Sequence, residues 1–98
     1  MAQVTIVTRD VAERFRGFLA SVMLEVAPCT YISPRMSKGV RERVWQVMTE
    51  WHFVEPRGSV VMIWTEREAT GGLKLAHLGT PAKTLQEIDG MWIARAGS

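Results

Sequence analysis

The sequence predicts a single α+β domain in which an antiparallel sheet carries two helices on one of its faces. The chain has 98 residues, of which 47% are hydrophobic and 22% charged, as in an ordinary globular domain. Short β-branched segments alternate with two longer segments whose apolar residues recur every three or four positions. No internal repeat or linker divides the chain, so residues 1–98 are expected to form one domain.

The first strand is predicted at residues 3–8, and the first helix begins at Asp10. The segment QVTIVT is short and β-branched, which is typical of a strand. Asp10 and Glu13 have the spacing of a capping box, so the Asp10 carboxylate is expected to accept the backbone N–H of Glu13. The apolar residues that follow define one helical stripe: Val11, Phe15, Phe18, Leu19 and Val22.

A hairpin and a second helix are predicted next. Residues 24–27 and 30–33 are strand candidates, and Pro28-Cys29 indicates a turn because proline cannot donate to a central ladder. Ser37 is expected to cap a helix whose apolar face consists of Val40, Val44, Val47, Met48 and Trp51. Lys38, Arg41 and Trp45 are three and four residues apart, so they form one ridge beside that face.

Further strands are predicted at residues 60–64, 73–78 and 91–95. The run VVMIW is continuously apolar, as expected of a central strand, and Asp89-Gly90 signals a turn before the last strand. The order is therefore β-α-β-β-α-β with extra C-terminal strands, which is the ferredoxin-like split βαβ pattern. Because both helices cover one sheet face, the opposite face needs a cover, and a second copy of the chain is the simplest one.

Composition argues against a membrane protein. The longest apolar run, residues 60–64, has five residues, far short of the roughly 20 that a membrane span needs. The N-terminal residues show no basic leader before an apolar stretch, so no secretory signal is expected. The single cysteine, Cys29, cannot form an internal disulfide, and we therefore expect a reducing, cytoplasmic location.

The basic residues are distributed unevenly. Residues 1–43 hold seven basic and four acidic side chains, whereas residues 44–98 hold five and six. All but three of the twelve basic residues are arginine, whose planar fork binds phosphate bidentately. This pattern hints at a polyanionic partner, although solvated surface charge is the commoner reason for a small net charge.

Short motifs follow one another in a fixed order along nearly the whole chain, none of them specific alone. They are Val7-Thr8, Arg14-x-Arg16-Gly17-x-Leu19-Ala20, Leu24-Glu25-Val26 with Tyr31, Ser37, Arg41-Glu42 with Trp45, Val60-Val61-Met62-x-Trp64, Thr70-Gly71, Gly79 and Asp89-Gly90. In this order and spacing they resemble the CRISPR-associated protein 2 family, specifically its type I-E subtype.

The resemblance implies a homodimer at the centre of the spacer-acquisition complex. In that complex, two dimers of the CRISPR integrase flank one dimer of this subunit, and the assembly inserts a short foreign double-stranded DNA into the CRISPR array. The strand at residues 91–95 would contact the partner subunit or the integrase. Wider members of the family have been described as metal-dependent endonucleases acting on RNA or double-stranded DNA, which is the alternative function. In the subtype, the scaffold role is the essential one.

The resemblance also assigns roles to individual basic residues. Arg14 and Arg16 match first-helix arginines that contact the duplex backbone, and an arginine fork suits repeating phosphates. Lys38 and Arg41 would extend this footprint onto the second helix. Lys83 lies where the subtype carries basic residues beyond the fifth strand. For each of these residues, a solvated helix or strand flank is the alternative interpretation.

The acidic residue near the end of the first strand departs from the family pattern. The wider family places an acid there, proposed to bind Mg²⁺ together with its symmetry mate, but here Arg9 follows Thr8 and the acid comes one residue later. Neighbouring residues of an extended segment point to opposite sides, so a shift of one residue can move the Asp10 carboxylate away from the dimer axis. Two interpretations of Asp10 remain, a helix cap and a catalytic Mg²⁺ ligand; one acid per subunit is compatible with magnesium.

Other candidate chemistry is weaker. His52 and His77 are 25 residues apart and, with Cys29, make no metal-ligand spacing. Tryptophans at helix and strand spacing are usually core or interface residues rather than base-stacking platforms, and this applies to Trp45, Trp51, Trp64 and Trp92. A ferredoxin-like RNA-binding or regulatory module is a third hypothesis, but the strand aromatics do not alternate on one face as it would require.

Overall fold

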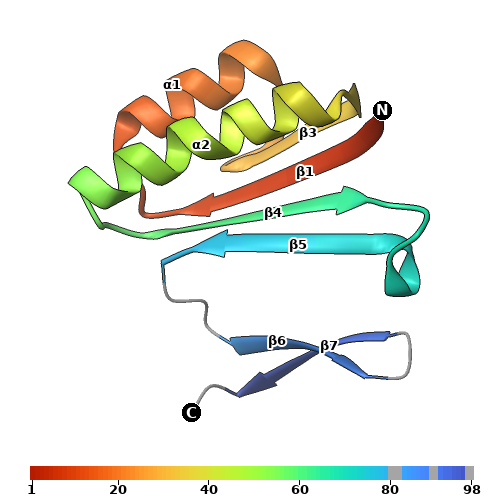
Figure 1. The fold of residues 1–98 in the computed structure, drawn as a ribbon. Helices are drawn as coiled ribbons and strands as arrows, with labels where there is room; N and C mark the ends of the chain where they lie inside the picture. The colour runs from red at the N-terminus through yellow and green to blue at the C-terminus, as the bar shows by residue number, and fades with distance from the viewer. Residues whose placement is uncertain (80–82, 89–90, 97–98) are drawn as a thin grey trace.

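The predicted ferredoxin-like arrangement is present. The computed structural model describes the backbone of residues 1–79, 83–88 and 91–96, and the side chains of residues 1–69 and 71–79. Within these residues, five antiparallel strands form one sheet in the order β2-β3-β1-β4-β5, and two more form a separate hairpin. Figure 1 shows both helices on the same face of the larger sheet. The first four strands and the two helices follow the order β-α-β-β-α-β, and β5 adds a fifth strand beside β4.

The elements have the following bounds. The strands of the larger sheet are β1 (Ala2–Arg9), β2 (Leu24–Ala27), β3 (Thr30–Met36), β4 (Ser59–Thr65) and β5 (Leu73–Leu78). The hairpin consists of β6 (Lys83–Ile88) and β7 (Met91–Ala96). The helices are α1 (Glu13–Val22), α2 (Lys38–Val54) and the short 3-10 helix η1 (Thr70–Gly72). Among the described residues, no helix is long and apolar enough to cross a membrane.

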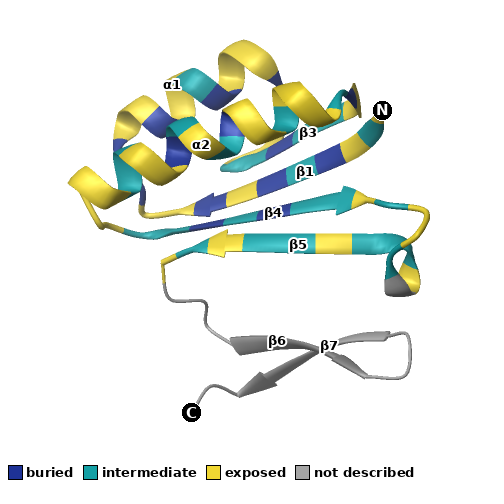
Figure 2. Ribbon diagram, viewed as in Figure 1, coloured by how far each residue is buried: buried dark blue, intermediate teal, exposed yellow. Residues whose placement is uncertain are grey.

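The core lies between the helices and one face of the sheet. In β1, buried and less buried residues alternate, so that Val4 and Ile6 point to the helices. Ile6 is opposite Tyr31 on one side and Met62 on the other, which places all three on the helix-facing side. Phe15 and Leu19 of α1 and Val44 and Met48 of α2 complete the same buried cluster. Figure 2 shows buried residues in dark blue on both helices and on the central strands.

The opposite face of the larger sheet is also apolar, and neither helix covers it (Figure 1). Thr5 is opposite Ile32 and Ile63, and Ile63 is opposite Leu75, so these residues share that face. We call it the open face and define it by Val7, Leu24, Ile32, Val61, Ile63 and Leu75. Val7 is 41% exposed and Leu24 62% exposed, which is more than a covered core strand allows.

The predicted start of the first helix is wrong. The helix begins at Glu13, its N-cap is Ala12, and no side chain caps it. Asp10 instead has a φ of 56°, in the left-handed region. The reason is tertiary: Val11 and Ala12 are buried, and Arg57 donates hydrogen bonds to the carbonyls of Asp10 (3.2 Å) and Val11 (3.3 Å). Burial of these two residues therefore outweighs the capping motif.

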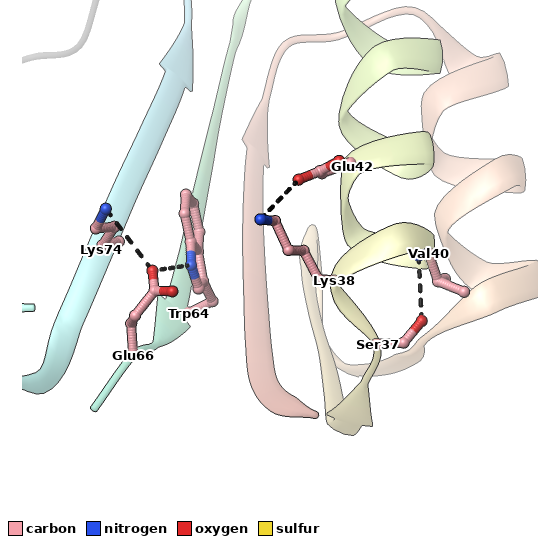
Figure 3. A network of polar contacts seen from close by, with 7 residues as sticks. All are labelled: Ser37, Lys38, Val40, Glu42, Trp64, Glu66 and Lys74. Atoms are coloured by element: carbon pink, nitrogen blue, oxygen red, sulfur yellow. Dashed lines mark hydrogen bonds and ion pairs between the residues drawn. The ribbon is translucent and has the colours of Figure 1, made fainter. Parts of the chain in front are cut away.

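The predicted cap of the second helix is confirmed. The Ser37 hydroxyl accepts a hydrogen bond from the backbone N–H of Val40 at 3.2 Å (Figure 3). Val44 and Met48 are buried as predicted, but Val40, in the first turn, is 49% exposed. The helix continues to Val54, three residues beyond the predicted apolar face.

The C-terminal region contains one strand more than predicted. β7 covers the predicted strand at residues 91–95 and pairs with β6. The sequence of β6, KTLQEI, is mostly polar and was not predicted to form a strand. β3 also runs three residues further than predicted, past Pro34, with a register shift opposite the start of β1 that accommodates the proline.

Candidate nucleic-acid interface

Arg14 and Arg16 are exposed on α1, on either side of the buried Phe15. Their positions follow from the helical period, because successive residues of a helix differ by about 100° in direction. Ion pairs within the described part of the chain involve Arg9, Lys38, Arg57 and Lys74 as the cations. No described carboxylate lies within 4.0 Å of Arg14 or Arg16, so both positive charges are available to an external anion.

Arg14 is held against α2. The Cζ atom of Arg14 lies 5.0 Å from the ring centroid of Trp51, over its face, and Nη2 donates to the Trp51 carbonyl oxygen at 3.5 Å. The indole itself is fixed by Phe15 and Phe18, whose rings meet it nearly edge-on at centroid distances of 5.6 and 5.4 Å. The guanidinium of Arg14 is thus stacked on a partly buried ring that packs against the core.

Arg16 lies beside the hydroxyl of Tyr31. Tyr31 is fully buried, and its hydroxyl makes no hydrogen bond within the described residues. Burial raises the pKa of the Tyr31 phenol, and the negative charge of Glu25 acts in the same direction. The proximity of the Tyr31 hydroxyl, in turn, raises the pKa of the Arg16 guanidinium, which stays fully charged. No described aromatic ring lies under the Arg16 guanidinium as Trp51 lies under that of Arg14.

Lys38 and Arg41 form a second basic group at the start of α2. The Cζ atom of Arg41 lies 4.5 Å from the ring centroid of Trp64, and the Trp64 Nε1–H donates to Glu66 at 3.2 Å. Lys38 pairs with Glu42 at 3.9 Å, so its charge is partly balanced. Figure 3 shows this pair and the contact of Trp64 with Glu66, which also pairs with Lys74 at 3.8 Å.

The five predicted basic residues do not form a single cluster within one chain. Arg14 touches α2 at Trp51, whereas Arg41 lies ten residues earlier on the same helix, about 15 Å away at 1.5 Å per residue. The two groups therefore lie towards opposite ends of α2. Lys83 is the first residue of β6, and its side chain is outside the described residues.

The residues around Asp10 do not fit a magnesium site within a single chain. The Asp10 carboxylate is 84% exposed and forms an ion pair with Arg9, whose Nε lies 3.9 Å from Oδ2. A guanidinium beside the carboxylate opposes the approach of a metal cation. Within the described residues, no three His, Cys, Asp or Glu side chains are grouped so that they could hold a metal ion. His52 contacts the Gly58 carbonyl oxygen at 3.4 Å.

A groove of about 320 Å³ lies beside the second basic group. Trp45, Met62, Trp64 and Ala76 supply its apolar walls, and Arg41, Glu42 and Gln46 supply the polar part of its lining. This lining contains no nucleophile paired with a base, so the groove does not resemble a catalytic site.

Two groups of contacts could not be predicted from the sequence. The stacks of Arg14 on Trp51 and of Arg41 on Trp64 join residues 37 and 23 positions apart, and no local motif signals such a pair. Arg57 donates hydrogen bonds to the turn before α1, although it lies more than 40 residues further along the sequence. Long-range contacts of this kind depend on the tertiary fold and not on a local pattern.

The fold and the basic side chains define a small ferredoxin-like α+β protein that presents exposed arginines on its helices. A family model described as CRISPR-associated protein (Cas_Cas2CT1978) matches residues 3–93, which is nearly the whole chain. The chain belongs to this family of CRISPR-associated proteins, and its function lies in CRISPR adaptation. The resemblance to a CRISPR-associated protein 2 is thereby confirmed at the level of the family.

Proposed function

We propose that the chain is a homodimeric scaffold of the spacer-acquisition complex, of the type I-E kind, that binds the foreign DNA duplex through its phosphate backbone. The observation that carries this proposal is the pair of exposed arginines on α1, neither of which has a described carboxylate within 4.0 Å. Phosphate contacts of this kind position a duplex without reading its sequence, which suits a protein that must accept many foreign DNAs.

The open face supports the dimer. Val7, Ile32, Val61 and Ile63 are apolar and lie on the side of the sheet that the helices leave bare. A 98-residue chain buries only roughly 60–70% of the surface that its unfolded form exposes, so covering this face adds substantially to its stability. A second copy of the same sheet is an apolar partner of matching size, and such pairing is the commonest form of homo-oligomer.

The hairpin of β6 and β7 is our candidate contact for the partner subunit or for the CRISPR integrase. Its strands pair with each other and form a sheet separate from the five-stranded one. A two-stranded hairpin is only marginally stable in water without further packing, which favours a role in assembly. In the proposed complex, two integrase dimers flank the dimer of this chain, and the duplex crosses its basic helices in the cytoplasm.

Metal-dependent nuclease activity is the competing function, with Asp10 as the residue that would bind Mg²⁺. The two functions are separated by spacer integration with purified integrase, comparing Arg14→Ala/Arg16→Ala with Asp10→Asn. Asparagine removes the charge but tolerates the left-handed backbone at this position. We expect the double arginine variant to lose most integration and Asp10→Asn to retain it. Loss of integration by a folded, dimeric Asp10→Asn variant, with the arginine variant still active, would support the nuclease instead.

A further inference from the structure

We propose that Trp51 and Trp64 are positioning residues that hold the guanidiniums of Arg14 and Arg41 ready for phosphate before DNA is bound. This inference rests on the proposed function and concerns how its phosphate contacts are organised. The two stacks are built alike: in each, the guanidinium of a helical arginine lies over an indole that other residues fix. The two pairs lie towards opposite ends of α2.

Both indoles are held in place by neighbouring residues. Phe15 and Phe18 meet the Trp51 ring at interplanar angles of 76° and 73°, and Phe15 is fully buried. Trp64 is held by its place in β4 and by the hydrogen bond from Nε1 to Glu66. A guanidinium that stacks on such a ring has few alternative positions, because leaving the face forfeits the cation–π contact.

Stacking leaves the phosphate-binding edge of the guanidinium available. The five N–H groups of arginine lie in the guanidinium plane, whereas the stack occupies one face of that plane. Arg14 gives one N–H to the Trp51 carbonyl, at the long distance of 3.5 Å. No described carboxylate within 4.0 Å competes for the remaining donors of Arg14 or Arg41.

Preorganisation of this kind lowers the entropic cost of binding. A free arginine side chain loses much rotamer freedom when it is fixed on a phosphate, and a stacked arginine has lost most of it already. Lysine carries the same charge but lacks the planar group that stacks on the indole face. The stacks therefore predict that Arg14 is needed as an arginine, beyond its contribution of one positive charge.

The test compares Arg14→Lys with Arg16→Lys in the complex with the integrase, using fluorescence anisotropy on a labelled DNA duplex. Both variants keep the charge and lose the arginine fork, but only Arg14→Lys loses a stack. We expect both to keep the salt dependence of wild-type binding. We expect Arg14→Lys to bind roughly 5- to 30-fold more weakly than Arg16→Lys, since each dimer loses the preorganisation of two side chains.

A second comparison leaves the basic side chains that are proposed to contact DNA unchanged. Trp64→Leu removes the support of Arg41, whereas Trp45→Leu removes an equally half-buried tryptophan from the same groove, and no described arginine stacks on Trp45. Trp64→Leu should weaken duplex binding severalfold relative to Trp45→Leu at an unchanged salt slope, and Trp64→Phe should restore part of the loss because it keeps an aromatic face.

The outcomes separate this inference from the proposed function. Equal binding by Arg14→Lys and Arg16→Lys, together with equal binding by the two leucine variants, would overturn the positioning role. The proposed function would survive that result as long as Arg14→Ala lowers the salt slope. An Arg14→Ala variant with wild-type slope and affinity would instead remove Arg14 from the DNA contact, and the role of Trp51 would fall with it.

Discussion

Tyr31 and Arg16 are neighbours in the structure but differ in burial. Tyr31 is the only tyrosine, fully buried in the core, while the adjacent Arg16 remains exposed on α1. A buried hydroxyl without a partner costs about 1–3 kcal/mol, so the phenol is not a stabilising contact in the described structure.

Among single residues, the type and helix position of the candidate phosphate-binding residues were predictable from the sequence, because helical spacing alone places Arg14 and Arg16 on exposed flanks.

The raised pKa of Tyr31 predicts a loss of stability at alkaline pH. In the unfolded chain the phenol ionises near its ordinary pKa of 10.0, whereas burial keeps it protonated in the folded chain. The folded chain therefore keeps its full stability below pH 10.0 and loses stability as the pH rises from there towards the folded pKa of Tyr31. Urea denaturation should show Tyr31→Phe to be at least as stable as wild type at neutral pH. Above pH 10.0 the variant should be more stable than wild type. Parallel alkaline losses in both proteins would contradict this account.

The elements follow their local patterns wherever no tertiary contact competes. β1 and β4 were predictable because β-branched and continuously apolar runs reflect their central place in the sheet. The start of α1 was not predictable from the sequence, because Val11 and Ala12 are buried and Arg57, from a remote part of the chain, fixes their turn. β6 was missed because its mostly polar sequence shows no strand pattern until β7 lies beside it.

The left-handed backbone at Asp10 predicts an order of stability that differs from that of a helix cap. At a φ of 56°, glycine and asparagine are tolerated best, while other residues cost roughly 1–2 kcal/mol. Asp10→Gly and Asp10→Asn should therefore match or exceed the unfolding free energy of wild type, and Asp10→Ala and Asp10→Ser should lie below both. A cap would be rescued by serine, so a stable Asp10→Ser beside a weakened Asp10→Gly would restore the capping interpretation.

The whole molecule presents two surfaces of different character. One consists of the helices, with stacked and exposed arginines, and the other is the apolar open face of the sheet. The second surface was anticipated from the fold class, because two helices cover only one side of such a sheet. The division of the basic residues between the two ends of α2 was not anticipated, since helical spacing relates residues only within one helix.

The open face predicts a homodimer that a single charge disrupts. Wild type should scatter light as twice the 11.0 kDa mass of the chain. Ile63→Lys places a charge in the middle of the open face and should give monomers, whereas Gln46→Lys, on the exposed side of α2, should leave the dimer intact. A wild-type mass of 11.0 kDa at micromolar concentration, or a fully dimeric Ile63→Lys, would exclude the open face as the interface.

The most direct test of the scaffold account is the salt dependence of duplex binding by the complex with the integrase. Two subunits supply eight candidate cations from Arg14, Arg16, Lys38 and Arg41, and neutralising most of them contributes roughly −5 to −7 to the slope of log affinity against log salt. The account predicts that Arg14→Ala/Arg16→Ala makes this slope shallower by about 3 to 4 and weakens all duplex sequences alike. The matched control Arg35→Ala/Arg43→Ala, which removes the same charge from other exposed positions, should keep the wild-type slope. An unchanged slope for the Arg14/Arg16 variant, or an equal change for the control, would contradict the account.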